Sequence, residues 1–270
     1  MGVLNLTPDS FSDGGRWFDP ADASRAVERG LALLAAGAEL LDLGAESTRP
    51  GGGVYGGGAR EVAATEELAR LLPVLEGLRA ATDAPLSVDT RKAAVARAAL
   101  GAGADLVNDV SALADPEMGA VVAGAGCPVI LMHSRGELAT MQQGIRFRDV
   151  VAEVRSELAE AVARAEAAGI ARGQIVIDPG IGFGKTAEQN LALLAGLPAL
   201  APLGLPVLVG ASRKSFLGAV TGEPPAGRLA GSLAAAARSA AGGAAILRVH
   251  DVAETASFLR VWAAIGEARA

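Results

Sequence analysis

The sequence lacks several features on which whole classes of protein depend. Cys127 is the only cysteine among 270 residues, so no disulfide can form within the chain. The sequence holds no run of about 18 apolar residues, the length a membrane-spanning helix needs. Its first residues, MGVLNLTPDS, have neither the basic nor the apolar stretch of a secretory signal. We therefore expect a cytoplasmic protein without a membrane segment.

The chain also lacks an excess of positive charge. Its 24 lysines and arginines face 30 acidic residues, which gives a net charge of -6. That balance argues against a nucleic-acid coat or a protein held on a membrane surface. Hydrophobic residues make up 51 % of the chain, which is enough for a large core and argues against disorder. We expect small-molecule partners, with no nucleic acid and no membrane.

Three polar residue types are rare. Lysine and asparagine each occur three times and histidine twice. One explanation of this scarcity is the overall composition of the chain. The other is that these residues remain only at positions where the side chain has a function. The positions are Lys92, Lys185, Lys214, Asn5, Asn108, Asn190, His133 and His250.

What the sequence does contain is a pattern that recurs eight times. A short run rich in Val, Ile and Leu ends in polar residues, and a helical segment follows. Continuous apolar runs of this kind are typical of parallel strands buried on both faces. The runs are 3–6, 39–43, 85–89, 105–109, 128–133, 174–178, 206–210 and 245–249.

The segments between the runs have helical periodicity. Val154, Leu158 and Val162 repeat at helical spacing, and Phe258 and Trp262 do so near the end of the chain. Eight strand-then-helix units predict a single α/β domain over residues 1–270, folded as a (β/α)8 barrel. An open doubly wound sheet is the alternative. The glycine-rich stretch 51–58 falls inside one connection and is interpreted as a mobile loop.

A barrel carries its function where the strands end, at their carboxyl side. Helix N-caps also favour Asp and Ser, which accounts for Asp109, Ser111 and Asp251. It does not account for cationic side chains beside carboxylates. The residues that leave the eight runs are Asn5, Glu46 to Arg49, Asp89, Asn108 and Asp109, His133, Asp178, Ser212 to Ser215, and Arg248 with His250.

The acceptors among these residues suit a ligand edge that carries several N–H groups. Asp89 and Asp178 are acceptors, and Asn108 is both an acceptor and a donor. Lys214 adds a donor for a carbonyl oxygen or a ring nitrogen. Together they predict a pocket for a nitrogen-rich heterocycle.

The cations suit a different part of the same ligand. Arg49, Arg248 and His250 form a separate positive cluster of the kind that binds phosphate. The amide oxygen of Asn5 suits a hard metal ion such as Mg²⁺. No reactive cysteine and no Ser-His-Asp arrangement is evident, so we do not expect a covalent enzyme intermediate.

Two familiar motifs are rejected. The residues 184–186 resemble the end of a phosphate-binding P-loop, but the required earlier glycine is replaced by Pro179. The glycines of 51–56 match GxGxxG, yet Pro73 stands about where an acidic ribose ligand is expected. Both matches are chance features of a chain with 35 glycines.

The strand-end segments together resemble the dihydropteroate synthase family. The similarity extends along the whole chain in order, and NLTPDSFSDGG, STRPG, DPGIGFGK and SRKSF are its most specific parts. The matching stretches are MGVLNLTPDSFSDGG, DLGAESTRPG, PLSVDT, LVNDVS, ILMHSRG, IDPGIGFGK, GASRKSF and RVHDV.

The resemblance implies a TIM barrel that joins 6-hydroxymethyl-7,8-dihydropterin diphosphate to 4-aminobenzoate in folate biosynthesis. The products are dihydropteroate and pyrophosphate, Mg²⁺ is the cofactor, and sulfonamides are inhibitors. It assigns the pterin to Asp89, Asn108, Met132, Asp178, Lys214 and Arg248. It assigns the diphosphate to Asn5, Arg49, Arg248 and His250, with Asn5 also at the metal. It assigns 4-aminobenzoate to Phe11, Thr48, Pro50 and Ser215, and catalysis to Asp13, Arg49, Lys214 and Arg248.

Two other functions fit the same scaffold. A pterin-dependent methyltransferase domain would share the barrel and the pterin pocket without needing the DSFSD or SRKSF segments. A non-catalytic pterin-binding protein should have lost Asp13, Arg49 or Lys214, and all three are present. The resemblance also implies a homodimer formed through the last helices.

Overall fold

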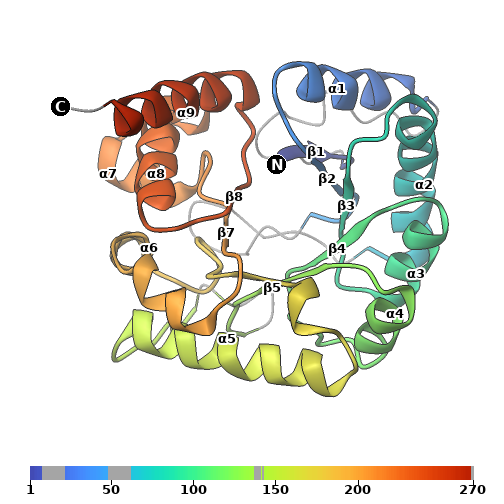
Figure 1. The fold of residues 1–270 in the computed structure, drawn as a ribbon, viewed down its shortest axis with the longest axis horizontal. Helices are drawn as coiled ribbons and strands as arrows, with labels where there is room; N and C mark the ends of the chain where they lie inside the picture. Colours follow the sequence, from blue (N-terminus) through green and yellow to red (C-terminus); the bar gives the residue numbers. More distant parts are fainter. Residues whose placement is uncertain (8–21, 48–61, 137–140, 142, 269–270) are drawn as a thin grey trace.

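The computed structural model describes residues 1–7, 22–47, 62–136, 141 and 143–268, and Figure 1 shows a ring of helices around a central set of strands. The strands are β1 (Gly2–Asn5), β2 (Leu41–Gly44), β3 (Leu86–Asp89), β4 (Leu106–Asp109), β5 (Val129–Met132), β6 (Ile175–Asp178), β7 (Leu208–Val209) and β8 (Ile246–Leu247). The helices are α1 (Ser24–Ala35), α2 (Ala64–Ala81), α3 (Ala93–Gly101), α4 (Met118–Ala125), α5 (Val150–Ala167), α6 (Ala187–Ala195), α7 (Ser215–Thr221), α8 (Leu229–Ala241) and α9 (Val252–Glu267). Short 3-10 turns lie at Arg172–Gln174, Leu197–Leu203 and Pro225–Gly227.

The strands close into a barrel. Strands β1 to β6 form one parallel sheet in sequence order, and β7 pairs in parallel with β8. Parallel bridges join Ile177 to Val207 and Gly2 to Val249, so each end of the larger sheet meets one strand of the pair. All eight predicted strands are present, and the (β/α)8 barrel is confirmed over the open doubly wound sheet.

The predicted helical stripes are confirmed in α5 but only in part in α9. Val154, Leu158 and Val162 are buried in α5, whose first turn is capped by the Asp149 carboxylate. In α9, Phe258 is half-buried and Trp262 is 43 % exposed, so these two residues are less buried than the α5 residues. Residues 261–268 of the chain are all exposed. No helix in the described ranges is long and apolar enough to cross a membrane.

The barrel interior changes from apolar to polar along the strands. Met1, Leu106, Ile130 and Leu208 form a buried cluster of their own, distinct from the larger core between strands and helices. Side chains that point inward recur at every second residue of a strand, so polar inward positions can stack above this cluster. The apolar cluster thereby forms the base on which the carboxyl ends of the strands present polar groups.

Candidate active site

The strand register brings the predicted polar residues together in two groups at the carboxyl ends of the strands. Asn5 of β1 is aligned with Gly44 of β2, Gly44 with Asp89 of β3, and Asp89 with Asn108 of β4. Met132 of β5 is aligned in the same way with Asp178 of β6. Because neighbouring parallel strands end together, residues far apart in the sequence form a single rim.

Arg248, which directly follows β8, links two carboxylates on other strands. Its Nε donates to Asp42 Oδ2 at 2.6 Å, and one terminal nitrogen donates to Asp89 Oδ2 at 2.9 Å. Asn108 Nδ2 also donates to Asp42 Oδ2, at 3.1 Å. Asp42 is fully buried and so holds two of the predicted pterin residues at once.

Asp42 was not predicted as a site residue. It lies inside the run ELLDL rather than at its end, so the strand-end criterion passed over it. The available signal was a carboxylate in the middle of an apolar strand, because such a group is almost never buried without a partner. Arg248 is that partner, and the predicted positive cluster is therefore not separate from the acceptors.

The buried charges do not balance in this part of the barrel. Two carboxylates, Asp42 and Asp89, face the single guanidinium of Arg248. Burial raises the pKa of Asp89 to about 8, Arg248 opposes the rise, and Asp42 adds to it. The second oxygen of each carboxylate is buried and has no hydrogen-bond partner in the part of the chain that the structure describes. Asp89 can therefore accept from a ligand N–H group or, when protonated, donate to a ligand acceptor.

Asp178 and Lys214 form the other half of the rim. Asp178 is buried, and its Oδ1 accepts from the backbone N–H of Gly180 at 2.7 Å. Burial raises the pKa of Asp178, although Lys214 counteracts the rise. Lys214 donates to the carbonyl of Ile181, and its Nζ lies 4.4 Å from the ring centroid of Phe183. Loss of water lowers the pKa of Lys214 to about 8, so it can hold or release a proton near neutral pH.

His250 does not contribute the positive charge expected of it. Its Nδ1 lies 3.1 Å from Ser212 Oγ, which also accepts from the His250 backbone N–H. Burial, and then the nearby Arg248 charge, lower the pKa of His250 to about 3. The imidazole is therefore neutral at physiological pH and offers a hydrogen bond rather than a charge. Ser215 begins α7 directly after Lys214.

The remaining predicted site residues lie outside the described residues. These are Phe11, Asp13, Thr48, Arg49 and Pro50, together with the glycine-rich stretch 51–58. Their placement in the site stays a prediction.

Two residues interpreted as helix caps have other roles. Asp109 accepts from the backbone N–H groups of Ser111 and Leu113 and so closes a turn after β4 rather than capping a helix. Asp251 precedes α9, but its carboxylate pairs with Arg213, with Nε to Oδ2 at 2.9 Å.

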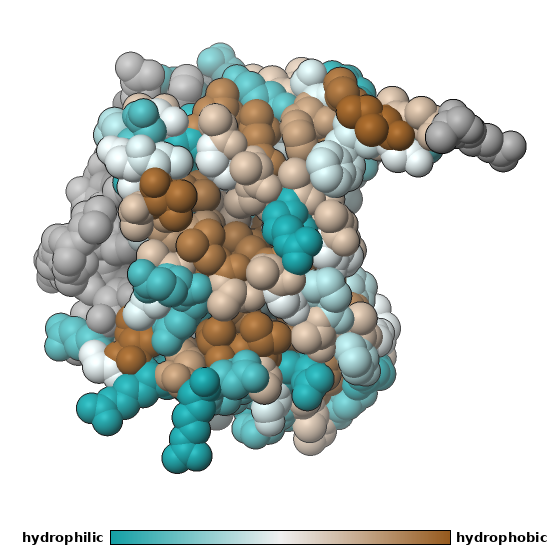
Figure 2. All heavy atoms as spheres, turned by 90° about the vertical axis from the view of Figure 1, so that its left-hand side faces the viewer, coloured by the Kyte–Doolittle hydropathy of each residue, from teal (hydrophilic) through white to brown (hydrophobic). Residues whose placement is uncertain are grey.

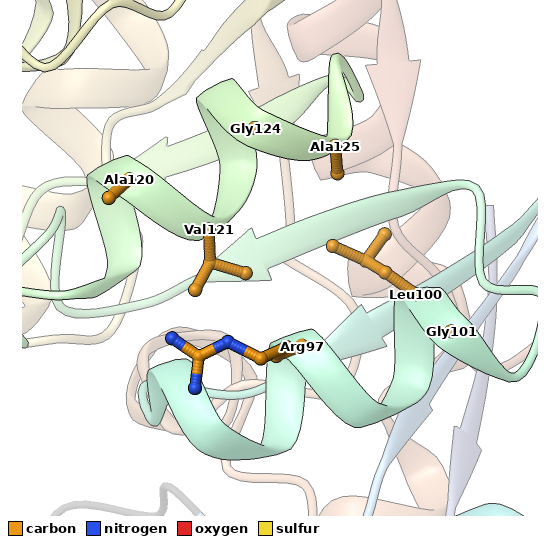
Figure 3. Close-up of a pocket in the computed structure, with 7 residues that line it drawn as sticks. All are labelled: Arg97, Leu100, Gly101, Ala120, Val121, Gly124 and Ala125. Atoms are coloured by element: carbon orange, nitrogen blue, oxygen red, sulfur yellow. The ribbon is translucent and has the colours of Figure 1, made fainter.

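A hollow on the outside of the barrel lacks this chemistry. It lies between α3 and α4 and is lined by small apolar residues such as Gly101, Ala120 and Val121, with Arg97 at its edge (Figure 3). Arg97 pairs with the exposed Glu117. The strand-end rim therefore remains the candidate active site.

Comparisons with known proteins agree with this geometry. Residues 1–250 match the family described as "Pterin binding enzyme". The chain is 46 % identical to a dihydropteroate synthase of Synechocystis sp. over 263 residues, which covers 97 % of this chain and 88 % of that protein.

Two solved structures are similar over nearly the whole chain. One is the Yersinia pestis dihydropteroate synthase with a sulfonamide drug complex, with a TM-score of 0.93 and 43 % identity, covering 99 % of this chain and 94 % of that one. The other is the Xanthomonas albilineans enzyme in complex with 7,8-dihydropteroate, with a TM-score of 0.86 and 46 % identity, covering 100 % of this chain and 94 % of that one.

The charge imbalance around Arg248 can be tested with Asp42→Asn. This change removes the carboxylate that repels Asp89 and leaves Arg248 to pair with Asp89 alone. The pKa of Asp89 should fall below its wild-type value, because both effects favour the charged form. A ¹³C NMR titration of the Asp89 carboxyl carbon measures it. Asp105→Asn, which removes an exposed partner of Arg79, is the control and should leave Asp89 unchanged. An unchanged Asp89 titration in Asp42→Asn would show that the two carboxylates act independently.

Proposed function

The chain belongs to the dihydropteroate synthases of the pterin-binding enzyme family, and from that premise we propose which of its residues bind each substrate part. Enzymes of this family condense 6-hydroxymethyl-7,8-dihydropterin diphosphate with 4-aminobenzoate. We propose that residues 1–270 act as one catalytic domain. The buried Oδ1 of Asp89 at the rim, which has no hydrogen-bond partner among the described residues, is the observation that carries the assignment, because an N–H group of the ligand would satisfy it.

The pterin ring occupies the pocket between the two halves of the rim. Asp178 accepts from its amino and imino groups, and Lys214 donates to its carbonyl oxygen or N5. Asp89 and Asn108 contact the ring from the other side, while Met132 lines the pocket and Arg248 covers the ring. The support is that Asp89, Asn108, Met132 and Asp178 are all buried at strand ends.

The pterin assignment can be tested by comparing two buried strand-end aspartates. Asp178→Asn should weaken pterin binding by about 3–5 kcal/mol, because a buried charged partner of the ring and of Lys214 is lost. Asp109→Asn is the matched control, since that carboxylate closes a turn and should affect stability instead. Titration calorimetry with 6-hydroxymethylpterin gives both affinities. Equal affinities in the two variants would refute the assignment.

The diphosphate extends from the pterin toward Asn5, Arg49, Arg248 and His250. Within the described residues no three His, Cys, Asp or Glu side chains gather to hold a metal, so an all-protein cage is not found there. Mg²⁺ often takes few protein ligands and completes its shell with substrate phosphates and water. The oxygen of Asn5 fits that role, with diphosphate oxygens as the other ligands. When bound, Mg²⁺ would neutralise charge on the departing diphosphate.

We assign the chemical step to a dissociative, SN1-like route. The bond between the pterin methylene carbon and the diphosphate oxygen breaks first, and the dihydropterin ring delocalises the positive charge. The neutral amine of 4-aminobenzoate then forms the C–N bond and loses a proton. Arg248 and the neutral His250 stabilise the leaving group, and Lys214 holds the ring. Asp13 and Arg49 are the further catalytic residues that the resemblance assigns.

The order of these events is testable. If the diphosphate leaves first, pyrophosphate should appear slowly with the pterin substrate and Mg²⁺ alone, and 4-aminobenzoate should accelerate its release. A coupled pyrophosphate assay with and without 4-aminobenzoate measures this. Release that depends strictly on 4-aminobenzoate would exclude the dissociative order.

The 4-aminobenzoate subsite is assigned to Phe11, Thr48, Pro50 and Ser215. Ser215 supports it, because this residue begins α7 next to the pterin-binding Lys214. A sulfonamide resembles the ring, amine and acidic group of 4-aminobenzoate, so it should occupy the same subsite. The cytoplasmic location stays a prediction.

The molecule also presents an apolar face suited to a second copy of the chain. In the described part of the chain, the exposed large hydrophobic residues are Leu191, Val220, Val261, Trp262 and Ile265. They belong to α6, α7 and α9, which lie on one side of the barrel in Figure 1. Figure 2 shows that side, with apolar residues at the projecting end of α9 and in patches below it. An apolar face of this kind marks an interaction surface, which supports a homodimer.

Light scattering tests the homodimer. At micromolar concentration the wild type should have twice the 27.0 kDa mass of one chain. Ile265→Glu should shift the mass toward the monomer, because it places a charge on the apolar face. Ala125→Glu, an exposed change on α4 at the other side of the barrel, should leave the mass unchanged. A monomeric wild type would contradict the proposal.

A further inference from the structure

Lys185 is a buried lysine to which the chemistry described above assigns no role. Only 3 % of the residue is exposed. Its Nζ lies 2.9 Å from the carbonyl oxygens of both Gly180 and Phe183, and 3.0 Å from His133 Nδ1. The carbonyl oxygen of His133 lies 3.4 Å away as a fourth acceptor, so all three N–H donors of the ammonium group have acceptors within reach. Lys185 therefore contacts backbone and imidazole groups where a buried cation normally contacts a carboxylate.

The imidazole that accepts from Lys185 is itself held in place. His133 Nε2 lies 3.0 Å from Glu157 Oε2, so the ring donates there and accepts at Nδ1. Glu157 is fixed in turn by Arg135, whose Nε donates to both carboxylate oxygens at 3.1 Å. A chain of polar contacts thus runs from α5 through the end of β5 to Lys185.

The two carbonyls bound by Lys185 belong to the segment 180–183, which directly follows β6. The backbone of this segment also touches both halves of the Asp178–Lys214 pair. The N–H of Gly180 donates to Asp178, and the carbonyl of Ile181 accepts from Lys214. Any shift of the segment would move a contact of each residue.

The segment fits tightly against the end of β5. Gly180 has φ +67, and a Cβ on it would lie 1.8 Å from the carbonyl oxygen of His133. Only glycine is compatible with that approach. The N–H of Gly182 is held from the other side by Asn190 Oδ1 at 2.6 Å. Lys185 binds the first and the last carbonyl of this segment, whose position these contacts narrowly define.

We propose that Lys185 is a positioning residue for pterin binding. By holding the carbonyls of Gly180 and Phe183, it sets the backbone that orients Asp178 and Lys214. This inference rests on the assignment of Asp178 and Lys214 to the pterin. In this role Lys185, the lysine of DPGIGFGK, contributes to recognition of the pterin ring and not to binding of the phosphates.

The test compares two lysines. Lys185→Met keeps the side-chain length and removes the three donors. It should weaken binding of 6-hydroxymethylpterin by about 10- to 100-fold, because small displacements of orienting groups have effects of that size. Pyrophosphate with Mg²⁺ should bind as in the wild type, since Asn5 ends β1 and His250 follows β8, both outside the segment 180–183. Lys92→Met is the matched control, because Lys92 pairs with the fully buried Glu67 and its loss should lower stability without changing pterin affinity.

A second variant covers the case in which Lys185→Met does not fold. His133→Leu removes one acceptor and leaves the two carbonyl contacts, so pterin binding should weaken in the same direction but less. Unchanged pterin affinity in folded Lys185→Met, or in His133→Leu, with a lowered melting temperature would overturn the proposal and leave Lys185 a purely structural role. If Asp178→Asn also leaves pterin affinity unchanged, the pocket assignment itself fails. If Asp178→Asn weakens pterin binding and the Lys185 and His133 variants do not, the pocket assignment stands and only the positioning role of Lys185 is wrong.

Discussion

Arg248 reaches from the end of β8 to carboxylates on β2 and β3, and the organisation of the active site follows from this contact. Asp42 holds the guanidinium from below, and Asp89 meets it at the rim. Asn108 shares the same oxygen of Asp42. A buried guanidinium is stable only when hydrogen-bonded acceptors surround it, so these four side chains depend on one another. Oδ1 of Asp89 has no hydrogen-bond partner among the described residues.

The opposite half of the rim is organised by backbone instead of charge pairs. Lys185 binds carbonyls of the segment 180–183, and that segment contacts Asp178 and Lys214. In one half of the rim, the carboxylate of Asp42 fixes the side chains of Arg248 and Asn108. In the other half, the glycine-rich turn after β6 fixes those of Asp178 and Lys214. Both arrangements place charges in low-dielectric surroundings, which moves the pKa of Asp89 and the pKa of Lys214 to about 8.

The fold and much of the site were predictable because both follow from short-range patterns. Apolar runs identified all eight strands, and polar residues at their ends identified Asp89, Asn108, Asp178 and Arg248. Asp42 was not predicted as a site residue, because periodicity does not reveal which face of a buried strand points into the barrel. The neutral state of His250 and the exposure of Trp262 depend on neighbours that no local pattern encodes. Lys185 was rightly rejected as a P-loop lysine, but its true contacts depend on the path of the turn before it.

The pairing of Arg248 with β2 and β3 has a consequence for how the protein is made. The contacts to Asp42 and Asp89 join residues 206 and 159 positions apart in the sequence. Contacts of such high sequence separation form late, because a long loop must be closed before they contribute. During synthesis, β2 and β3 leave the ribosome long before Arg248 does. The strand-end rim can therefore close around Arg248 only after residue 248 has left the ribosome, so it is among the last parts of the barrel to form.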